Sequence, residues 1–152
     1  MNERLPLIRF EVRIRYGDVD PMGWVYYANY LRFFEIGRAE MLRALGRSYA
    51  QVEIEDGVLL PVLEARARYL QGARYDELIA IETGVIDCAR ASVRFGYRIV
   101  GERGGELALG FTEHCYLTRE GRPVRPPAVL RGLLERAPRV EPGLAKRMLQ
   151  GD

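Results

Sequence analysis

The chain has 152 residues, which suits one domain with a substantial hydrophobic core and is too short for two ordinary domains. Apolar residues make up 48% and charged residues 29%, and no stretch approaches the ~20 consecutive apolar residues that cross a bilayer, so we expect no membrane insertion. A net charge of +2 is too small to predict a nucleic-acid partner. The first residues lack the organisation of a secretory signal, so a cytoplasmic location is expected.

The apolar pattern predicts one strand and two helices in the first third of the chain. Apolar and charged side chains alternate over residues 10–16, which is the period of a half-buried strand. Over residues 28–45, apolar residues recur at three- and four-residue steps, which predicts a helix that Gly46 ends. Gly37 inside it costs ~1 kcal/mol relative to alanine, so we expect a close approach of a sheet there. Ser48 is a suitable cap for a short second helix.

Four more strands and a last helix follow. The strands are expected at residues 59–70, 77–88, 92–100 and 106–118. Their short connections favour antiparallel neighbours, and Pro126-Pro127 predicts the start of a helix that reaches about residue 136. This is an α+β pattern, in which a curved antiparallel sheet wraps around one long helix. We assign residues 1–152 to this single domain and expect a partly mobile tail from about residue 137.

The two cysteines and the single histidine do not predict a metal site. Cys88 and Cys115 form neither a Cys-x-x-Cys pair nor a cluster with His114. Isolated cysteines in expected strands are typical of small buried hydrophobes, and a packed or edge role is expected for the histidine. We therefore expect no metal site.

An acidic turn joins the first strand to the long helix. Asp20 can open a four-residue turn, because Pro21 supplies the fixed φ of the second position and Gly23 suits the fourth. The carboxylate then lies beside the free N–H groups of residues 26–28, where the helix dipole favours an oxygen that gains negative charge. A turn aspartate that only binds its own backbone is the alternative interpretation. We expect Asp18 to brace the turn.

This turn and the following helix resemble a known family. The motif Asp-x-Asp-x-x-Gly within residues 16–30, followed by Phe-Glu-Ile-Gly-Arg at residues 34–38, is similar to the signature of the hotdog-fold acyl-CoA thioesterases. The resemblance is to the 4-hydroxybenzoyl-CoA thioesterase branch and covers roughly residues 8–135. It implies a hotdog fold and a hydrolase that needs no cofactor, because coenzyme A (CoA) is part of the substrate. It also implies a homodimer or homotetramer with sites at subunit interfaces.

The resemblance implies catalytic roles for Asp20 and Tyr27. Asp20 would attack the thioester carbonyl as a nucleophile or act as the general base for a water, and the sequence leaves both routes open. The backbone N–H of Tyr27 aligns with the oxyanion donor of the family. Another branch, which hydrolyses short aliphatic acyl-CoAs, has a histidine at this position. Tyrosine here therefore favours an aromatic acyl group, and we expect aromatic or short-to-medium acyl groups overall.

Three further residues are candidates for binding the acyl group. Trp24 and Tyr26, together with Tyr27, are suited to line an aryl pocket, and packing of their rings against the sheet is the alternative. Glu35 aligns with a helix carboxylate that reaches the substrate hydroxyl in the 4-hydroxybenzoyl enzyme. An ion pair between Glu35 and Arg38, three residues later, is the alternative that we favour.

The resemblance also implies a phosphate site for CoA. In the similar branch, a basic cluster between two later strands binds the phosphates. This chain keeps Arg90 and Ser92. The neighbouring positions, which are basic in that branch, hold Ala89 and Ala91 here. Arg90 is suited to charge-assisted phosphate contacts, and a solvated hairpin arginine is the alternative.

Other functions of the same fold remain open. A hotdog dehydratase or hydratase would need a histidine paired with an acid, and the single His114 argues against it. A non-catalytic hotdog protein would bind acyl-CoA without releasing free thiol. A thioesterase that acts on acyl-carrier-protein thioesters would use the same residues.

Overall fold

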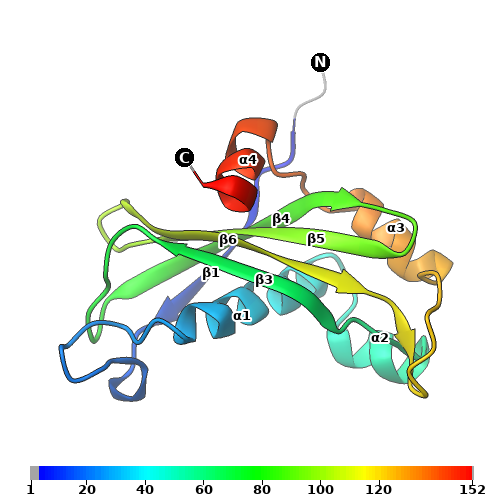
Figure 1. The fold of residues 1–152 in the computed structure, drawn as a ribbon, viewed down its shortest axis with the longest axis horizontal. Coiled ribbons are helices and arrows are strands. Elements are labelled where there is room, and N and C mark those ends of the chain that lie inside the picture. The colour runs from blue at the N-terminus through cyan, green and yellow to red at the C-terminus, as the bar shows by residue number, and fades with distance from the viewer. Residues whose placement is uncertain (1–3, 152) are drawn as a thin grey trace.

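The computed structural model describes residues 4–151, which form a sheet with helices on both faces (Figure 1). The sheet has five strands, each antiparallel to its neighbours, in the order β1-β4-β5-β6-β3. Their bounds are β1 (Ile8–Arg13), β3 (Val62–Tyr69), β4 (Leu78–Cys88), β5 (Ser92–Val100) and β6 (Glu106–Cys115). A separate short pair joins β2 (Val58–Leu59) to β7 (Leu117–Thr118).

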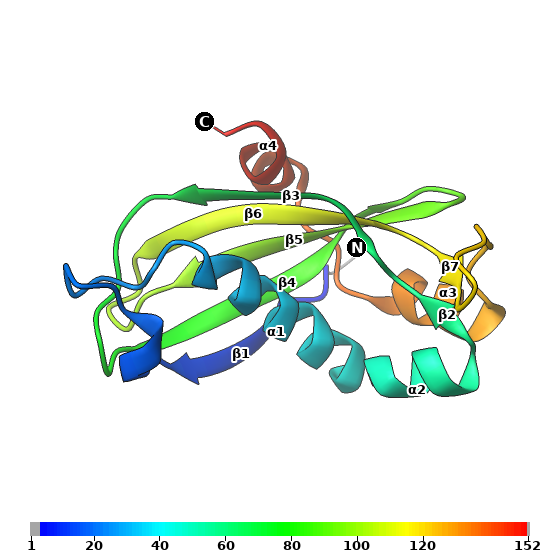
Figure 2. The same cartoon turned by 60° about the horizontal axis from the view of Figure 1, so that its bottom comes forward.

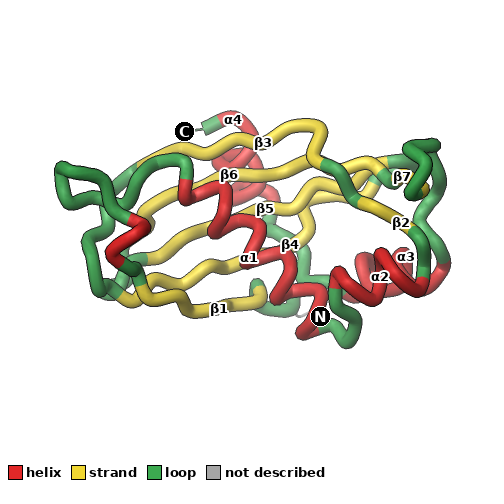
Figure 3. Tube along the Cα trace, turned by 90° about the horizontal axis from the view of Figure 1, so that it is seen from below, coloured by secondary structure: helices red, strands yellow, loops and turns green. Residues whose placement is uncertain are grey.

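The longest helix lies across one face of this sheet. The helices are α1 (Asn29–Ala44), α2 (Tyr49–Glu55), α3 (Ala128–Arg136) and α4 (Pro142–Gln150), with a short 3-10 turn at Tyr16–Asp18. Figure 3 shows α1 crossing the strands, and Figure 1 shows α4 against the opposite face. In the part of the chain that the structure describes, no helix is long and apolar enough to cross a membrane.

The main hydrophobic core lies between α1 and the sheet. Phe33, Phe34 and Met41 of α1 are fully buried there. The ring of Phe34 stacks on that of Tyr97 in β5, with 4.5 Å between the ring centroids. A Cβ atom on Gly37 would lie only 2.6 Å from Ile81 Cγ2, so this glycine lets helix and sheet approach closely. The predicted α+β architecture, with an antiparallel sheet around one long helix, is confirmed.

Most expected elements are present, but the strands expected at residues 59–70 and 106–118 are each divided in two, and the first strand ends earlier than expected. The Oγ atom of Ser48 accepts a hydrogen bond from the Gln51 N–H at 3.2 Å and caps α2 as predicted. The strand expected at residues 59–70 is divided into β2 and β3 around Pro61, which has no N–H for a sheet. The first strand ends before Tyr16, whose ring instead stacks on Tyr75 in an exposed position.

The segment after residue 137, which we expected to be partly mobile, forms helix α4. Leu144 and Met148 are buried and pack with Val140 on the outer face of the sheet. Pro142 occupies the first turn, and the Glu141 carboxylate accepts a hydrogen bond from the Leu144 N–H at 2.6 Å. A proline at the helix start and apolar residues four positions apart are the signals of this helix in the sequence.

Candidate active site

The acidic turn holds one oxygen of the Asp20 carboxylate and leaves the other free. The Gly23 N–H donates to the Asp20 carbonyl at 2.9 Å, which closes the predicted turn, and the φ of +85° at Gly23 favours glycine. Oδ1 of Asp20 accepts hydrogen bonds from the N–H groups of Met22, at 2.9 Å, and Trp24, at 3.3 Å. In the described part of the chain, Oδ2 accepts none. This oxygen is therefore available to a substrate or a water.

Two unbonded N–H groups lie just ahead of α1. The Tyr26 N–H donates to the Asp18 carbonyl at 2.8 Å, so one of the three N–H groups that we expected to be free is used within the chain. The N–H groups of Tyr27 and Ala28 donate to no other group among the described residues. Both stand at the positive end of the helix dipole, where they favour an oxygen that gains negative charge.

A cavity of about 370 Å³ has both Asp20 and Tyr27 in its wall. Aromatic side chains form much of the remaining wall: Trp24, Tyr30 and Tyr69. The Tyr69 hydroxyl donates to the Tyr27 carbonyl at 3.1 Å, and the Tyr69 ring meets Tyr30 edge-on at 5.1 Å. Burial raises the pKa of Tyr30 to about 12, so its hydroxyl remains a donor at neutral pH. The cavity thus combines a carboxylate and backbone donors with a mostly apolar wall.

Trp24 and Tyr26, both predicted to bind substrate, differ in their positions. The Trp24 ring lines the cavity and is held in place, with the Arg74 guanidinium 3.6 Å from its centroid. A Cβ atom on Gly72 would lie 2.5 Å from Trp24 Cε3, so the ring packs closely on the backbone there. Tyr26 lies outside the cavity wall and contacts the Tyr27 ring at 4.8 Å.

Asp18, two residues before Asp20, is buried and braces the turn. Its Oδ2 atom accepts a hydrogen bond from the Arg15 N–H at 2.8 Å, and its Oδ1 atom pairs with Arg32 of α1. The Asn29 side chain donates to the Asp18 carbonyl at 2.9 Å. These contacts tie the turn to the start of α1.

Glu35 lies on an exposed face of α1 and outside the Asp20 cavity. The ion pair that we favoured between Glu35 and Arg38 is absent, and that prediction was wrong. The Arg38 guanidinium instead donates to the hydroxyls of Tyr49, at 3.2 Å, and Tyr97, at 3.5 Å. Spacing along the helix did not reveal these acceptors because they come from α2 and β5.

His114 is part of the core, away from the Asp20 cavity. It is fully buried, with Nδ1 2.9 Å from the Leu60 carbonyl and Nε2 2.8 Å from Thr112 Oγ1. Burial lowers its pKa to about 4, so it is neutral at neutral pH. Among residues 4–151, no group of three or more His, Cys, Asp or Glu side chains could hold a metal ion.

Arg90 and Ser92 lie at the far end of the sheet from Asp20. They belong to the hairpin between β4 and β5, next to α3, whereas the segment between β1 and α1 lies at the other end (Figures 1 and 2). β4 connects the two ends with 11 residues, which at ~3.3 Å per residue separates them by roughly 30 Å. One chain therefore does not bring the expected CoA residues to its own Asp20.

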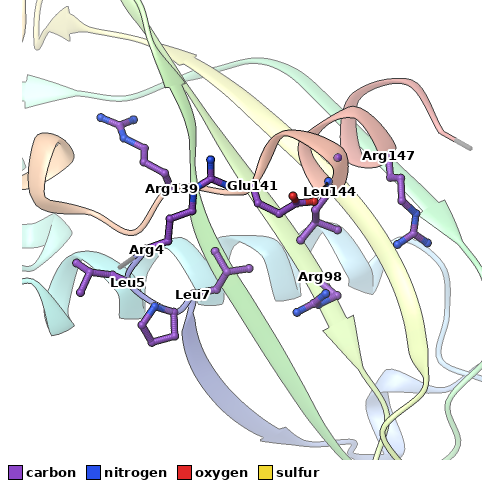
Figure 4. Close-up of a pocket in the computed structure, with 10 residues that line it drawn as sticks. Arg4, Leu5, Leu7, Arg98, Arg139, Glu141, Leu144 and Arg147 are labelled. Carbon is purple, nitrogen blue, oxygen red and sulfur yellow. Dashed lines mark hydrogen bonds between the residues drawn. The ribbon is translucent and has the colours of Figure 1, made fainter. Parts of the chain in front are cut away.

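A further hollow lies on the sheet face that carries α4 (Figure 4). It has a volume of about 620 Å³ and lies between the N-terminal segment and α4. Arg147 pairs with Glu106 at 2.8 Å, and Arg98 pairs with Glu82 at 2.6 Å, so acidic neighbours offset much of the positive charge. None of the residues predicted to act on the substrate lines it.

The fold and the Asp20 turn define a hotdog protein of the thioesterase type: an antiparallel sheet around one helix, with a carboxylate at the helix start. The chain belongs to the Thioesterase-like superfamily, whose family model matches residues 14–147. This match confirms the resemblance to thioesterases that was inferred from the Asp20 turn and the helix after it.

Individual relatives extend the comparison. The chain is 34% identical to YneP of Bacillus subtilis (strain 168) over 111 residues, 72% of this chain and 79% of that protein. It is 30% identical to the 4-hydroxybenzoyl-CoA thioesterase of Pseudomonas sp. (strain CBS-3) over 87 residues, 56% of this chain and 62% of that protein. The solved structure of the DHNA-CoA thioesterase from Staphylococcus aureus shares 30% identity, with a TM-score of 0.73 over 77% of this chain and 78% of that one.

Proposed function

We propose that this chain is an acyl-CoA thioesterase, which hydrolyses a thioester to a free acid and CoA at the Asp20 cavity. One observation carries the proposal: the Asp20 carboxylate, with its Oδ2 atom free, and Tyr27, with its N–H unbonded, line the same cavity. Membership of the Thioesterase-like superfamily supports this class of reaction. A carboxylate beside backbone donors is the arrangement that attack on a thioester carbonyl requires.

Two routes use these groups. In the first, Asp20 Oδ2 forms a bond to the thioester carbon, the C–S bond breaks, CoA leaves as the thiolate, and water hydrolyses the mixed anhydride. In the second, Asp20 takes a proton from a water whose oxygen bonds to the same carbon, and the C–S bond then breaks as CoA leaves as the thiolate. In both routes the carbonyl oxygen gains negative charge next to the Tyr27 N–H. The Met22 and Trp24 N–H groups hold Oδ1 and thereby orient Oδ2.

The cavity supports an aromatic or a short-to-medium acyl group. Its volume of about 370 Å³ and its walls of Trp24, Tyr30 and Tyr69 suit a ring or a short apolar chain. Two relatives carry names of aryl-CoA thioesterases, which also favours an aromatic substrate.

We further propose a homodimer or homotetramer in the cytoplasm. β3 forms an open edge of the sheet, and Val62, Leu63 and Tyr69 on it are exposed. An unpaired edge of this kind favours pairing with the same edge of a second copy. Because Arg90, Ser92 and Glu35 lie away from their own Asp20 cavity, we propose that they serve the cavity of another copy.

The test is thiol release from a panel of benzoyl-, hydroxybenzoyl-, phenylacetyl- and straight-chain acyl-CoAs. We expect the protein to hydrolyse aryl-CoAs and the Asp20→Asn variant to lose this activity while remaining folded. The asparagine keeps an oxygen for the Met22 and Trp24 N–H groups, so the turn is preserved. Equal activity in both proteins would refute the role of Asp20.

Two alternatives give other outcomes in the same experiment. A non-catalytic acyl-CoA-binding protein would bind the panel tightly and release no thiol. A thioesterase for acyl-carrier-protein thioesters would hydrolyse the carrier-bound acyl group much faster than the same acyl group on CoA.

A further inference from the structure

The Trp24 side chain lies between two neighbouring cavities. One is the Asp20 cavity of about 370 Å³, and the other has a volume of about 400 Å³. Trp24, Gln71 and Gly72 line both cavities, whereas Asp20 and Tyr27 line only the first. The indole is therefore part of the wall that separates the proposed reacting groups from a second space of similar size.

Arg74, in the segment between β3 and β4, packs on this indole. Its Cζ atom lies 3.6 Å from the ring centroid, which is a close cation–π contact. A Cβ atom on Gly23 would lie 3.0 Å from Arg74 Nη1, so the same guanidinium also lies against the backbone of the turn. Among residues 4–151, the guanidinium forms no ion pair and donates no hydrogen bond. Its position is therefore explained by Trp24 and the turn.

The backbone of Trp24 is held independently of its ring. Its N–H donates to Asp20 Oδ1 at 3.3 Å, and its carbonyl accepts a hydrogen bond from the Asp20 N–H at 2.8 Å. The Val25 N–H donates to the Ala73 carbonyl at 2.9 Å, and Trp24 and Arg74 form an antiparallel bridge. Because these contacts use the main chain of Trp24, a change of the indole keeps the hydrogen bonds that hold Asp20.

The ring itself depends on two contacts for its position. Trp24 is 39% exposed, so the hydrophobic core does not enclose it. The ring packs closely over Gly72, where a Cβ atom would lie 2.5 Å from Cε3, and Arg74 stacks on it. An acyl group that extends from the Asp20 cavity toward the second cavity meets this ring.

We propose that Trp24 limits the length of the acyl group and that Arg74 is the positioning residue that keeps the indole in the wall. This inference rests on the proposed function, because the limit applies to a thioester bound in the Asp20 cavity. An acyl group with one aromatic ring fits the cavity, whereas a second ring in line with the first collides with the indole. When the indole is removed, the second ring takes its place and stacks on the Arg74 guanidinium.

The first test compares benzoyl-CoA with 4-phenylbenzoyl-CoA, which share the reacting carbonyl and the first ring and differ in length. For the wild type, we expect kcat/KM to be about 100-fold higher for benzoyl-CoA. Trp24→Ala should lower this ratio about tenfold or more by raising kcat/KM for the longer thioester. Damage to the site would lower activity and would not produce this gain.

Three further variants sharpen this comparison. Arg74→Ala should lower the ratio several-fold, and Arg74→Lys, which restores a cation beside the ring, should recover part of it. Trp24→Phe keeps a smaller ring over Gly72, so it should give an intermediate ratio even if the alanine variant does not fold. Arg103→Ala is the matched control, because this exposed arginine lines the second cavity and does not stack on Trp24. The unfolding midpoint of each variant checks folding.

Fluorescence reports the position of the ring without any substrate, because Trp24 is the single tryptophan of the chain. We expect Arg74→Ala to lower the steady-state anisotropy of its emission, since the released ring moves more freely, and Arg74→Lys to restore it in part. Arg103→Ala should keep the wild-type anisotropy. Wild-type anisotropy in a folded Arg74→Ala variant would overturn the positioning role of Arg74.

Failure of the length limit and failure of the proposed function give different results. A folded Trp24→Ala variant that hydrolyses both thioesters in the wild-type ratio would overturn the limit and leave the thioesterase intact. Release of no thiol by the wild type would refute the proposed function, and calorimetric affinities for the two acyl-CoAs would then test the limit. A ratio of affinities that narrows about tenfold in Trp24→Ala would support the limit, and an unchanged ratio would overturn it.

Discussion

The two ends of the sheet differ in what holds their polar groups. At the end that contains Asp20, backbone N–H groups fix one carboxylate oxygen, and two further N–H groups lie unbonded at the start of α1. At the hairpin end, Arg90, the residue expected to bind phosphate, is an exposed side chain. A bond-forming step needs fixed distances, whereas recognition of a phosphate needs charge within reach. Changes to Asp20 should therefore alter kcat, and changes at the hairpin end should alter KM.

Asp20→Asn tests this division with the largest expected effect. Loss of the carboxylate removes the nucleophile or general base, so kcat should fall by about 10²–10⁴-fold with KM little changed. Steady-state kinetics on an aryl-CoA, with the unfolding midpoint as the control for folding, measures this. A variant in which KM alone changes would make Asp20 a binding residue and remove the contrast between the ends.

His114 pairs with Val93 near the hairpin end but is buried in the core, so low pH should act on it by lowering the stability of the fold. Its pKa of about 4 in the fold is below the ~6.5 of an unfolded chain, so the unfolded state binds the proton first as pH falls. The contribution of His114 to the free energy of unfolding is therefore fully present above pH ~6.5. It is lost as the pH falls toward ~4, by up to about 3 kcal/mol. Urea unfolding at several pH values measures the slope, and His114→Gln should remove most of it. An unchanged slope in this variant would assign the pH dependence to other groups.

Asp18→Ala separates the brace of the turn from its reactive carboxylate. The substitution removes the acceptor for the Arg15 N–H and the partner of Arg32. We expect the free energy of unfolding to fall by about 2 kcal/mol. Urea unfolding measures this loss, and Asp18→Asn, which keeps one acceptor oxygen, should recover part of it. Full stability in the alanine variant would show that the brace contributes nothing.

A change in ionic strength should also distinguish the two ends, and its effect on KM is the smallest that we expect. Raising ionic strength from about 0.1 M to about 1 M shortens the Debye length from ~10 Å to ~3 Å, which screens the exposed arginine. KM for an acyl-CoA should rise several-fold, whereas kcat and the KM of an acyl-N-acetylcysteamine thioester, which lacks the nucleotide, should change little. An equal effect on both thioesters would mean that salt acts at the Asp20 cavity.

The features that the sequence predicted well are formed by residues close together in the chain. The helix expected at residues 28–45 is α1, Asn29–Ala44, because its apolar stripe and Gly46 both mark it. The turn at Asp20 was also predictable, since each of its residues has a backbone preference of its own. The catalytic roles of Asp20 and Tyr27 stay predictions.

Contacts between segments that are far apart in the sequence could not be predicted from it. The acceptors of Arg38 lie on α2 and β5, so helix spacing pointed wrongly to Glu35. Arg74 carries no motif, and only the packing of the segment between β3 and β4 on the acidic turn places it on Trp24. A cation and a ring on separate segments could not be paired before the fold was known.

A crystal structure of the Asp20→Asn variant with an unhydrolysed aryl-CoA would test the central claim most directly. The account predicts that the thioester oxygen lies within ~3 Å of the Tyr27 N–H and that the carbonyl carbon faces the side chain at position 20. A thioester bound elsewhere, such as in the hollow beside α4, would contradict it.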